Sequence, residues 1–215
     1  MKLIVIPGAA DPKTSYKEVY DLLEEEATRR SFTKFIVKNY PGHYSYDDNS
    51  YLSVAETVNI IRSAILELEE KKESYIVLCR SFGCLPFVEF LKSYPENIVF
   101  LKKVVLWGVS PYYLWYKNFF KEFDPKVFKD RNVRVKRELF DEIYPVELSI
   151  DEISKNLNFK IYITSGDQDH HHPVHFQTLL KTMNQNPTIV LSDMIEGEGH
   201  AITKKNESYF NLIFQ

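Results

Sequence analysis

Residues Tyr75–Phe90 read YIVLCRSFGCLPFVEF, and the pattern of the sequence changes in the middle of this stretch. The first half is a continuous apolar run that is typical of a buried strand, whereas the second half spaces its apolar residues as a helix does. Ser81 lies at the junction, between Cys79 and Gly83. A serine in this place either begins the helix or serves as a nucleophile, and the surrounding sequence has to distinguish the two.

Short apolar runs alternate with helical patterns on both sides of this stretch. Continuous apolar strands are typical of a parallel sheet that is buried on both faces, and strand–helix alternation favours the α/β class. We therefore expect a mostly parallel six-stranded sheet with helices on both faces. Besides the strand at 74–79, the expected strands are 2–6, 33–39, 102–107, 159–164 and 188–194, and the expected helices are 16–30, 54–70, 84–94, 175–183 and a short one ending near 214.

One long connection interrupts this alternation, between the fourth and fifth expected strands. Residues 110–158 are first aromatic, then basic and then acidic. Connections of this length are usually active-site lids or small inserted subdomains. We expect a single domain over residues 1–215 with a lid at 110–158. Its aromatic run either lines an apolar pocket or packs its own helices, and its basic run is either a solvated face or a surface for an anionic substrate.

Composition excludes several classes of function. A net charge of −3 over 215 residues argues against a general nucleic-acid-binding protein. The two cysteines favour a reducing compartment, so we expect a cytoplasmic protein. No stretch approaches the roughly 20 apolar residues of a membrane span, and the apolar run LIVI near the start is too short for a signal peptide. The oligomeric state is not indicated.

Polar clusters follow three of the expected strands. Ser81 follows the third strand, GDQDHHHP (166–173) the fifth, and EGEGHAI (196–202) the sixth. Because ligands in open parallel sheets bind at the carboxyl ends of the strands, we expect these clusters to meet at one edge. They supply a serine, aspartates and a histidine in that chain order.

This arrangement resembles the α/β-hydrolase superfamily, in which the nucleophile follows a strand in a G-x-S-x-G elbow. The corresponding residues here are Cys79-Arg80-Ser81-Phe82-Gly83, with cysteine in place of the first glycine. The resemblance implies the α/β-hydrolase fold and makes Ser81 the expected nucleophile. Cysteine is small enough to be compatible with the tight turn.

The resemblance also implies an acid and a base. A G-x-x-D pattern followed by a proline matches Gly166 to Pro173 and makes Asp169 the expected acid. Asp167 is the competitor, with an alternative role as a turn residue that bonds its own backbone. The expected base is His200, which follows the last strand and has glycines at 197 and 199.

Acyl transfer also needs N–H donors for the developing oxyanion. The resemblance places one on the backbone of Phe82 and the other on that of Ala9, in the loop Pro7-Gly8-Ala9-Ala10 after the first strand. The sequence YPGHY (40–44) resembles the P-G-H-G turn that often follows the next strand.

Together these features predict a serine hydrolase that cleaves an ester or thioester of a small acyl substrate and needs no metal or organic cofactor. The alternatives are a non-catalytic module that binds a small ligand on the same fold, or acyl transfer, C–C or amide hydrolysis by the same triad. His170, His171, His172 and His175 could be metal ligands, but neighbouring loop side chains do not normally converge on one ion. Cys84 is expected to be a buried packing residue and His43 a turn residue.

Overall fold

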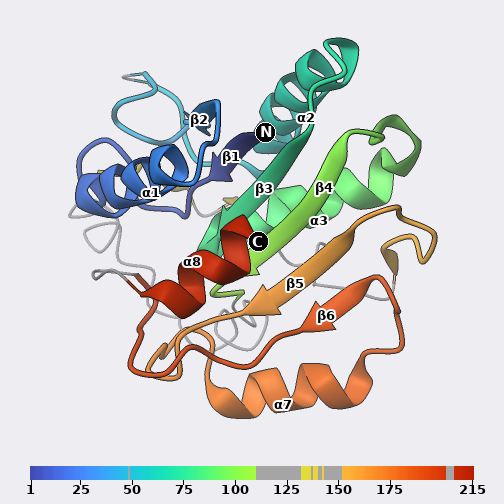
Figure 1. Ribbon diagram of the computed structural model, residues 1–215. Coiled ribbons are helices and arrows are strands. Elements are labelled where there is room, and N and C mark those ends of the chain that lie inside the picture. The colour runs from blue at the N-terminus through green and yellow to red at the C-terminus, as the bar shows by residue number, and fades with distance from the viewer. Residues whose placement is uncertain (48, 110–131, 137, 140–141, 143–151, 202–205) are drawn as a thin grey trace.

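The computed structural model describes residues 1–215 except 48, 110–131, 137, 140–141, 143–151 and 202–205. Six strands form one sheet in the order β2-β1-β3-β4-β5-β6, and every adjacent pair is parallel (Figure 1). The strands are β1 Lys2–Ile6, β2 Lys34–Val37, β3 Tyr75–Arg80, β4 Leu101–Trp107, β5 Lys160–Thr164 and β6 Ile189–Leu191. The fold class expected from the sequence is therefore confirmed.

Helices cover both faces of this sheet. Their bounds are α1 Lys17–Arg29, α2 Val54–Glu70, α3 Cys84–Ser93, α7 Val174–Met183 and α8 Glu207–Phe214. The apolar sides of α1 and α8 pack on one face, and those of α2, α3 and α7 pack on the other (Figure 1). None of the helices in the described residues is long and apolar enough to cross a membrane.

The central strands are apolar on both sides because both faces are buried. All six residues of β3 are buried, and so are the last four residues of β1. Successive side chains of a strand point to opposite faces. In β3, Cys79 therefore belongs to the core beneath α2 and α3, whereas Leu78 belongs to the core beneath α1 and α8. Arg80, two residues after Leu78, contacts α1 on that same face.

The strands are all parallel, but the direction in which successive strands are added to the sheet reverses between β1 and β3. From β1 the chain moves outward to β2, then returns to the other side of β1 to form β3. The loops that follow these two neighbouring strands diverge at their carboxyl ends, which is where open α/β sheets bind ligands. Gly8 follows β1 and Ser81 follows β3, so both lie at this switch point.

Candidate active site

Ser81 sits in a tight turn that joins β3 directly to α3. The turn is a short 3₁₀ segment, Ser81–Gly83, and Ser81 has a φ of +49°. Non-glycine residues rarely adopt this left-handed region, and such strain is concentrated at functional sites. Gly83 permits the turn, because a Cβ there would lie only 2.3 Å from the carbonyl oxygen of Pro7. The start of α3 can thus approach the end of β1 closely and hold Ser81 at the sheet edge.

Cys79 takes the position at which the elbow pattern has its first glycine. Its side chain is fully buried in the core beneath α2 and α3. Burial raises the pKa of the Cys79 thiol well above its usual value, so the thiol stays protonated and unreactive. Cys84 is also fully buried, and its thiol lies 3.6 Å from the carbonyl oxygen of Trp107. Both cysteines are packing residues of the core.

Asp169 and His200 are hydrogen-bonded to each other. The Nδ1–H of His200 donates to Oδ2 of Asp169 at 2.9 Å, although the two residues belong to different loops. The hydroxyl of Ser165 also donates to Oδ2, and the backbone N–H of His171 donates to Oδ1 at 2.8 Å. Burial by itself raises the pKa of Asp169, but these bonds, led by that from His200, outweigh it and lower the pKa to about 2. Asp169 is therefore a buried, ionised partner that fixes the imidazole tautomer.

Gly108, just after β4, makes room for this pair. A Cβ on Gly108 would lie 3.0 Å from Nδ1 of His200 and 3.2 Å from Oδ2 of Asp169. Its φ of +65° is also one that glycine adopts without strain. A side chain at this position would both strain the backbone and crowd the hydrogen-bonded Asp169–His200 pair.

The backbone of His200 is fixed by two buried side chains. Nη2 of Arg80 donates to the carbonyl oxygen of His200 at 3.2 Å, and the indole Nε1–H of Trp107 donates to the same oxygen at 3.1 Å. Arg80 ends β3 and Trp107 ends β4, so two strands hold the loop that carries His200. The imidazole itself remains 23% exposed and can be reached from solvent.

Ser81 and His200 line one pocket at this edge. The other lining residues of the described chain are Gly8, Ala9, Ala10, Tyr16, Tyr20 and Arg80. The pocket therefore brings together the serine, the histidine and the loop after β1. Phe82, whose N–H is the other expected oxyanion donor, is buried in the turn next to Ser81.

The loop after β1 is held by the loop after β2. The hydroxyl of Tyr40 lies 2.6 Å from the carbonyl oxygens of both Pro7 and Gly8. Nε2–H of His43 donates to the Gly8 oxygen at 3.1 Å. Burial of His43 lowers its pKa to about 4, so the ring stays neutral at physiological pH. The sequence indicated only a turn residue at this position, but His43 also braces the segment that contains Ala9.

Comparison with known proteins rests on structure, since neither a family model nor a curated protein matches the sequence. The monoacylglycerol lipase of Paleococcus ferrophilus matches with a TM-score of 0.64 and 17% identity, over 99% of this chain and 92% of the lipase. An esterase from Rhodococcus sp. ECU1013 matches with a TM-score of 0.66 and 15% identity, over 99% of this chain and 88% of the esterase. The meta-cleavage product hydrolase of Pseudomonas fluorescens IP01 matches with a TM-score of 0.61 and 15% identity, over 100% of this chain and 89% of the hydrolase. The chain has the α/β-hydrolase fold.

The side chain of Asp167 has a different hydrogen-bond partner from the one that the sequence suggested. Instead of bonding its own local backbone, its Oδ1 accepts from the N–H of Gly197 at 2.9 Å. Asp167 is exposed, whereas Asp169 is 2% exposed. In this α/β-hydrolase fold, Asp167 thus ties the loop after β5 to the loop that leads to His200, and Asp169 contacts His200 itself.

The histidine run is dispersed around the edge of the α/β-hydrolase sheet. His172 is buried, and its Nδ1–H donates to the carbonyl oxygen of Val109 while Nε2 contacts Gln177 at 2.8 Å. The ring of His171 lies 4.6 Å from that of His200, and His170 and His175 are exposed. Within the described residues, no group of three or more His, Cys, Asp or Glu side chains is placed to hold a metal ion.

Several residues that shape the site were not identified from the sequence. Arg80 carried the clearest signal, because it is a charged residue at the end of an otherwise apolar strand. Trp107, Gly108 and Ser165 had no local pattern that set them apart, and the turn motif at 40–44 did not indicate that Tyr40 bonds the loop after β1. Most of the expected lid, 110–158, lies outside the described residues, so the lid remains a prediction.

Proposed function

We propose that this protein is a serine hydrolase that cleaves an ester or thioester of a small acyl substrate. Ser81 is the nucleophile, His200 the general base and Asp169 the acid that orients and stabilises the imidazole. The observation that carries this proposal is the hydrogen bond from His200 to the buried Asp169, with His200 lining the same pocket as a backbone-strained Ser81. Lipases, esterases and other hydrolases among the structures of the same fold support it.

The reaction follows from the arrangement. Neutral His200 takes the proton of the Ser81 hydroxyl as the oxygen attacks the substrate carbonyl carbon. Its Nδ1–H is held by Asp169, so Nε2 is the atom that accepts the proton. The backbone N–H groups of Phe82 and Ala9 are the proposed oxyanion donors, each worth about 3 kcal/mol in the transition state. The protonated imidazole then gives its proton to the leaving alcohol or thiol, and water, activated by His200, releases the acid from Ser81.

Labelling with a fluorophosphonate probe, read by intact mass, tests the nucleophile. We expect one adduct on the wild-type protein, none on Ser81→Ala and strongly slowed labelling of His200→Ala. Cys84→Ala is the matched control, because it removes the nearby buried thiol and should label like the wild type. A folded wild-type protein that takes no label would favour the non-catalytic binding module instead.

The substrate class is tested by a series of nitrophenyl esters and acyl thioesters of increasing chain length. We expect turnover of the short members that depends on Ser81 and His200. Labelling of Ser81 without turnover of any ester or thioester would point to another reaction of the same triad.

A further inference from the structure

Arg80 is buried, and its positive charge takes no part in the reaction steps proposed above. The residue is 5% exposed and directly precedes Ser81. Its Nη1 lies 3.4 Å from the hydroxyl of Tyr20, and its Nη2 donates to the His200 carbonyl oxygen at 3.2 Å. The guanidinium carbon lies 5.8 Å and 5.6 Å from the ring centres of Tyr16 and Tyr20. All of these partners are neutral.

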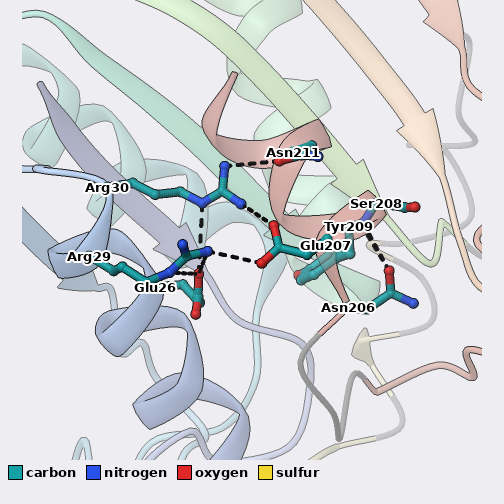
Figure 2. Close-up of polar contacts among 8 residues, drawn as sticks. All are labelled: Glu26, Arg29, Arg30, Asn206, Glu207, Ser208, Tyr209 and Asn211. Carbon is teal, nitrogen blue, oxygen red and sulfur yellow. Dashed lines mark hydrogen bonds and ion pairs between the residues drawn. The ribbon is translucent and has the colours of Figure 1, made fainter.

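No carboxylate among the described residues forms an ion pair with Arg80, and its Nε–H has no hydrogen-bond partner there. Buried charges in proteins are normally paired, because removing an ion from water without a counter-ion is costly. The same chain follows this rule elsewhere: Arg30, whose side chain is 17% exposed, is paired with Glu26 and Glu207 (Figure 2). Arg80 is thus a cation without a counter-ion in the described part of the protein.

The surroundings of Arg80 belong to the pocket at Ser81. Arg80, Tyr16 and Tyr20 line this pocket together with Ser81 and His200, and no aspartate or glutamate of the described residues lines it. A guanidinium has five N–H groups in a planar fork that matches a carboxylate. The bonds to Tyr20 and His200 use two of them. The group that would complete Arg80 is therefore an anion that enters through the pocket.

We propose that Arg80, with the rings of Tyr16 and Tyr20, forms an anion subsite of this pocket, and that the substrate is a short ester bearing a carboxylate. This inference rests on the proposed hydrolase function. Arg80 and Ser81 line the same pocket, so a short substrate can place one group at Arg80 and its carbonyl at Ser81. A half-ester of a small dicarboxylic acid carries both of these groups.

The test compares two esters of equal chain length, monomethyl succinate and methyl butyrate, in which a carboxylate replaces a methyl group. We expect wild-type kcat/KM to favour monomethyl succinate by roughly 10-fold or more, as a charged hydrogen-bond partner would give. Arg80→Met should abolish this preference, and Arg80→Lys should retain part of it. Because Arg80 also holds His200, both esters should slow in Arg80→Met, and the ratio between them isolates the subsite.

Arg62→Met is the matched control. The Arg62 guanidinium also lies over a tyrosine ring, 4.6 Å from the centre of Tyr94, but on the exposed side of α2 and outside the pocket. Its loss should leave the substrate ratio unchanged. Calorimetric titration of Ser81→Ala adds a binding readout that needs no turnover: monomethyl succinate should bind more tightly than methyl butyrate, and the additional change Arg80→Met should remove the difference.

The outcomes separate the two proposals. A wild-type protein that labels at Ser81 but hydrolyses methyl butyrate at least as well as monomethyl succinate overturns the anion subsite and leaves the hydrolase standing. A preference for monomethyl succinate that is as large in Arg80→Met as in the wild type also overturns it. If the methionine variant does not fold, an undiminished preference in Arg80→Lys has the same meaning. A protein that does not label at Ser81 contradicts the hydrolase, and the titration then decides the subsite alone.

Discussion

At the scale of single residues, two aspartates two positions apart do different work. Asp169 is buried and its Oδ2 accepts from His200, while Asp167 is exposed and accepts from the N–H of Gly197. The turn from Gly166 to Asp169, closed by a backbone bond of 3.2 Å, sends one carboxylate inward and the other outward. The sequence predicted that both aspartates lie in the loop after β5. Only the structure shows which of them reaches His200.

The exchange Asp169→Asn should lower kcat by roughly 10³- to 10⁴-fold, because an amide can stabilise the wrong imidazole tautomer and cannot balance its charge. Asp167→Asn keeps a side-chain oxygen for Gly197 and should stay within about threefold of the wild type, since it has no bond to His200. Steady-state kinetics on the best ester gives both values. The reverse order of losses would move the acid to Asp167.

At the scale of elements, ion pairs join the end of α1 to the start of α8. Arg29 and Arg30 at the end of α1 bond Glu26 of the same helix and Glu207 at the start of α8 (Figure 2). Nη1 of Arg30 also donates to Asn211 at 3.0 Å. The side chain of Glu26 is 2% exposed, whereas that of Glu207 is 67% exposed. The network fixes the helix that follows the His200 loop in the chain.

Replacing Glu26 by Gln should lower the free energy of unfolding by about 2–3 kcal/mol, because it leaves partly buried arginine charges without their buried counter-ion. Glu207→Gln is the matched change on the exposed side of the same network and should cost less than about 1 kcal/mol. Urea unfolding at pH 7 measures both. Equal losses in the two variants would show that burial of Glu26 does not set its contribution.

At the scale of the whole molecule, the order of the elements was predictable and their contacts were not. Apolar runs between helical patterns predicted all six strands, and the rule that parallel strands share a carboxyl edge brought Ser81, Asp169 and His200 to one place. Nothing in the sequence indicated that Arg80 and Trp107 would bond one carbonyl, since that depends on the path of the His200 loop in space. The periodicity of apolar residues predicts strands and helices, but it does not predict the path of an irregular loop.

The stability of the molecule should also depend on pH through His43. Its folded-state pKa of about 4 lies below the ~6.5 of an unfolded chain. Between these values the unfolded state binds a proton that the folded state refuses, so the free energy of unfolding falls as pH decreases. From pH 7 to pH 4 the loss from this one residue should be about 3 kcal/mol.

Urea unfolding of the wild type and of His43→Gln at both pH values isolates this contribution. The glutamine variant should lose about 3 kcal/mol less than the wild type over the interval, because it has no imidazole to protonate. His170→Gln, at an exposed position, is the control and should behave like the wild type. Parallel losses in all three proteins would contradict the assignment to His43.

The left-handed backbone conformation of Ser81 should lower the stability of the fold. A non-glycine residue at a φ of +49° costs roughly 1–2 kcal/mol that a glycine would not incur. Replacing glycine by alanine usually stabilises a protein by about 0.4–1 kcal/mol, yet here Ser81→Gly should melt at or above the temperature of Ser81→Ala. The protein should then be more stable with a glycine at position 81 than with a Cβ there, so selection for stability alone would favour glycine over any residue that has a side chain.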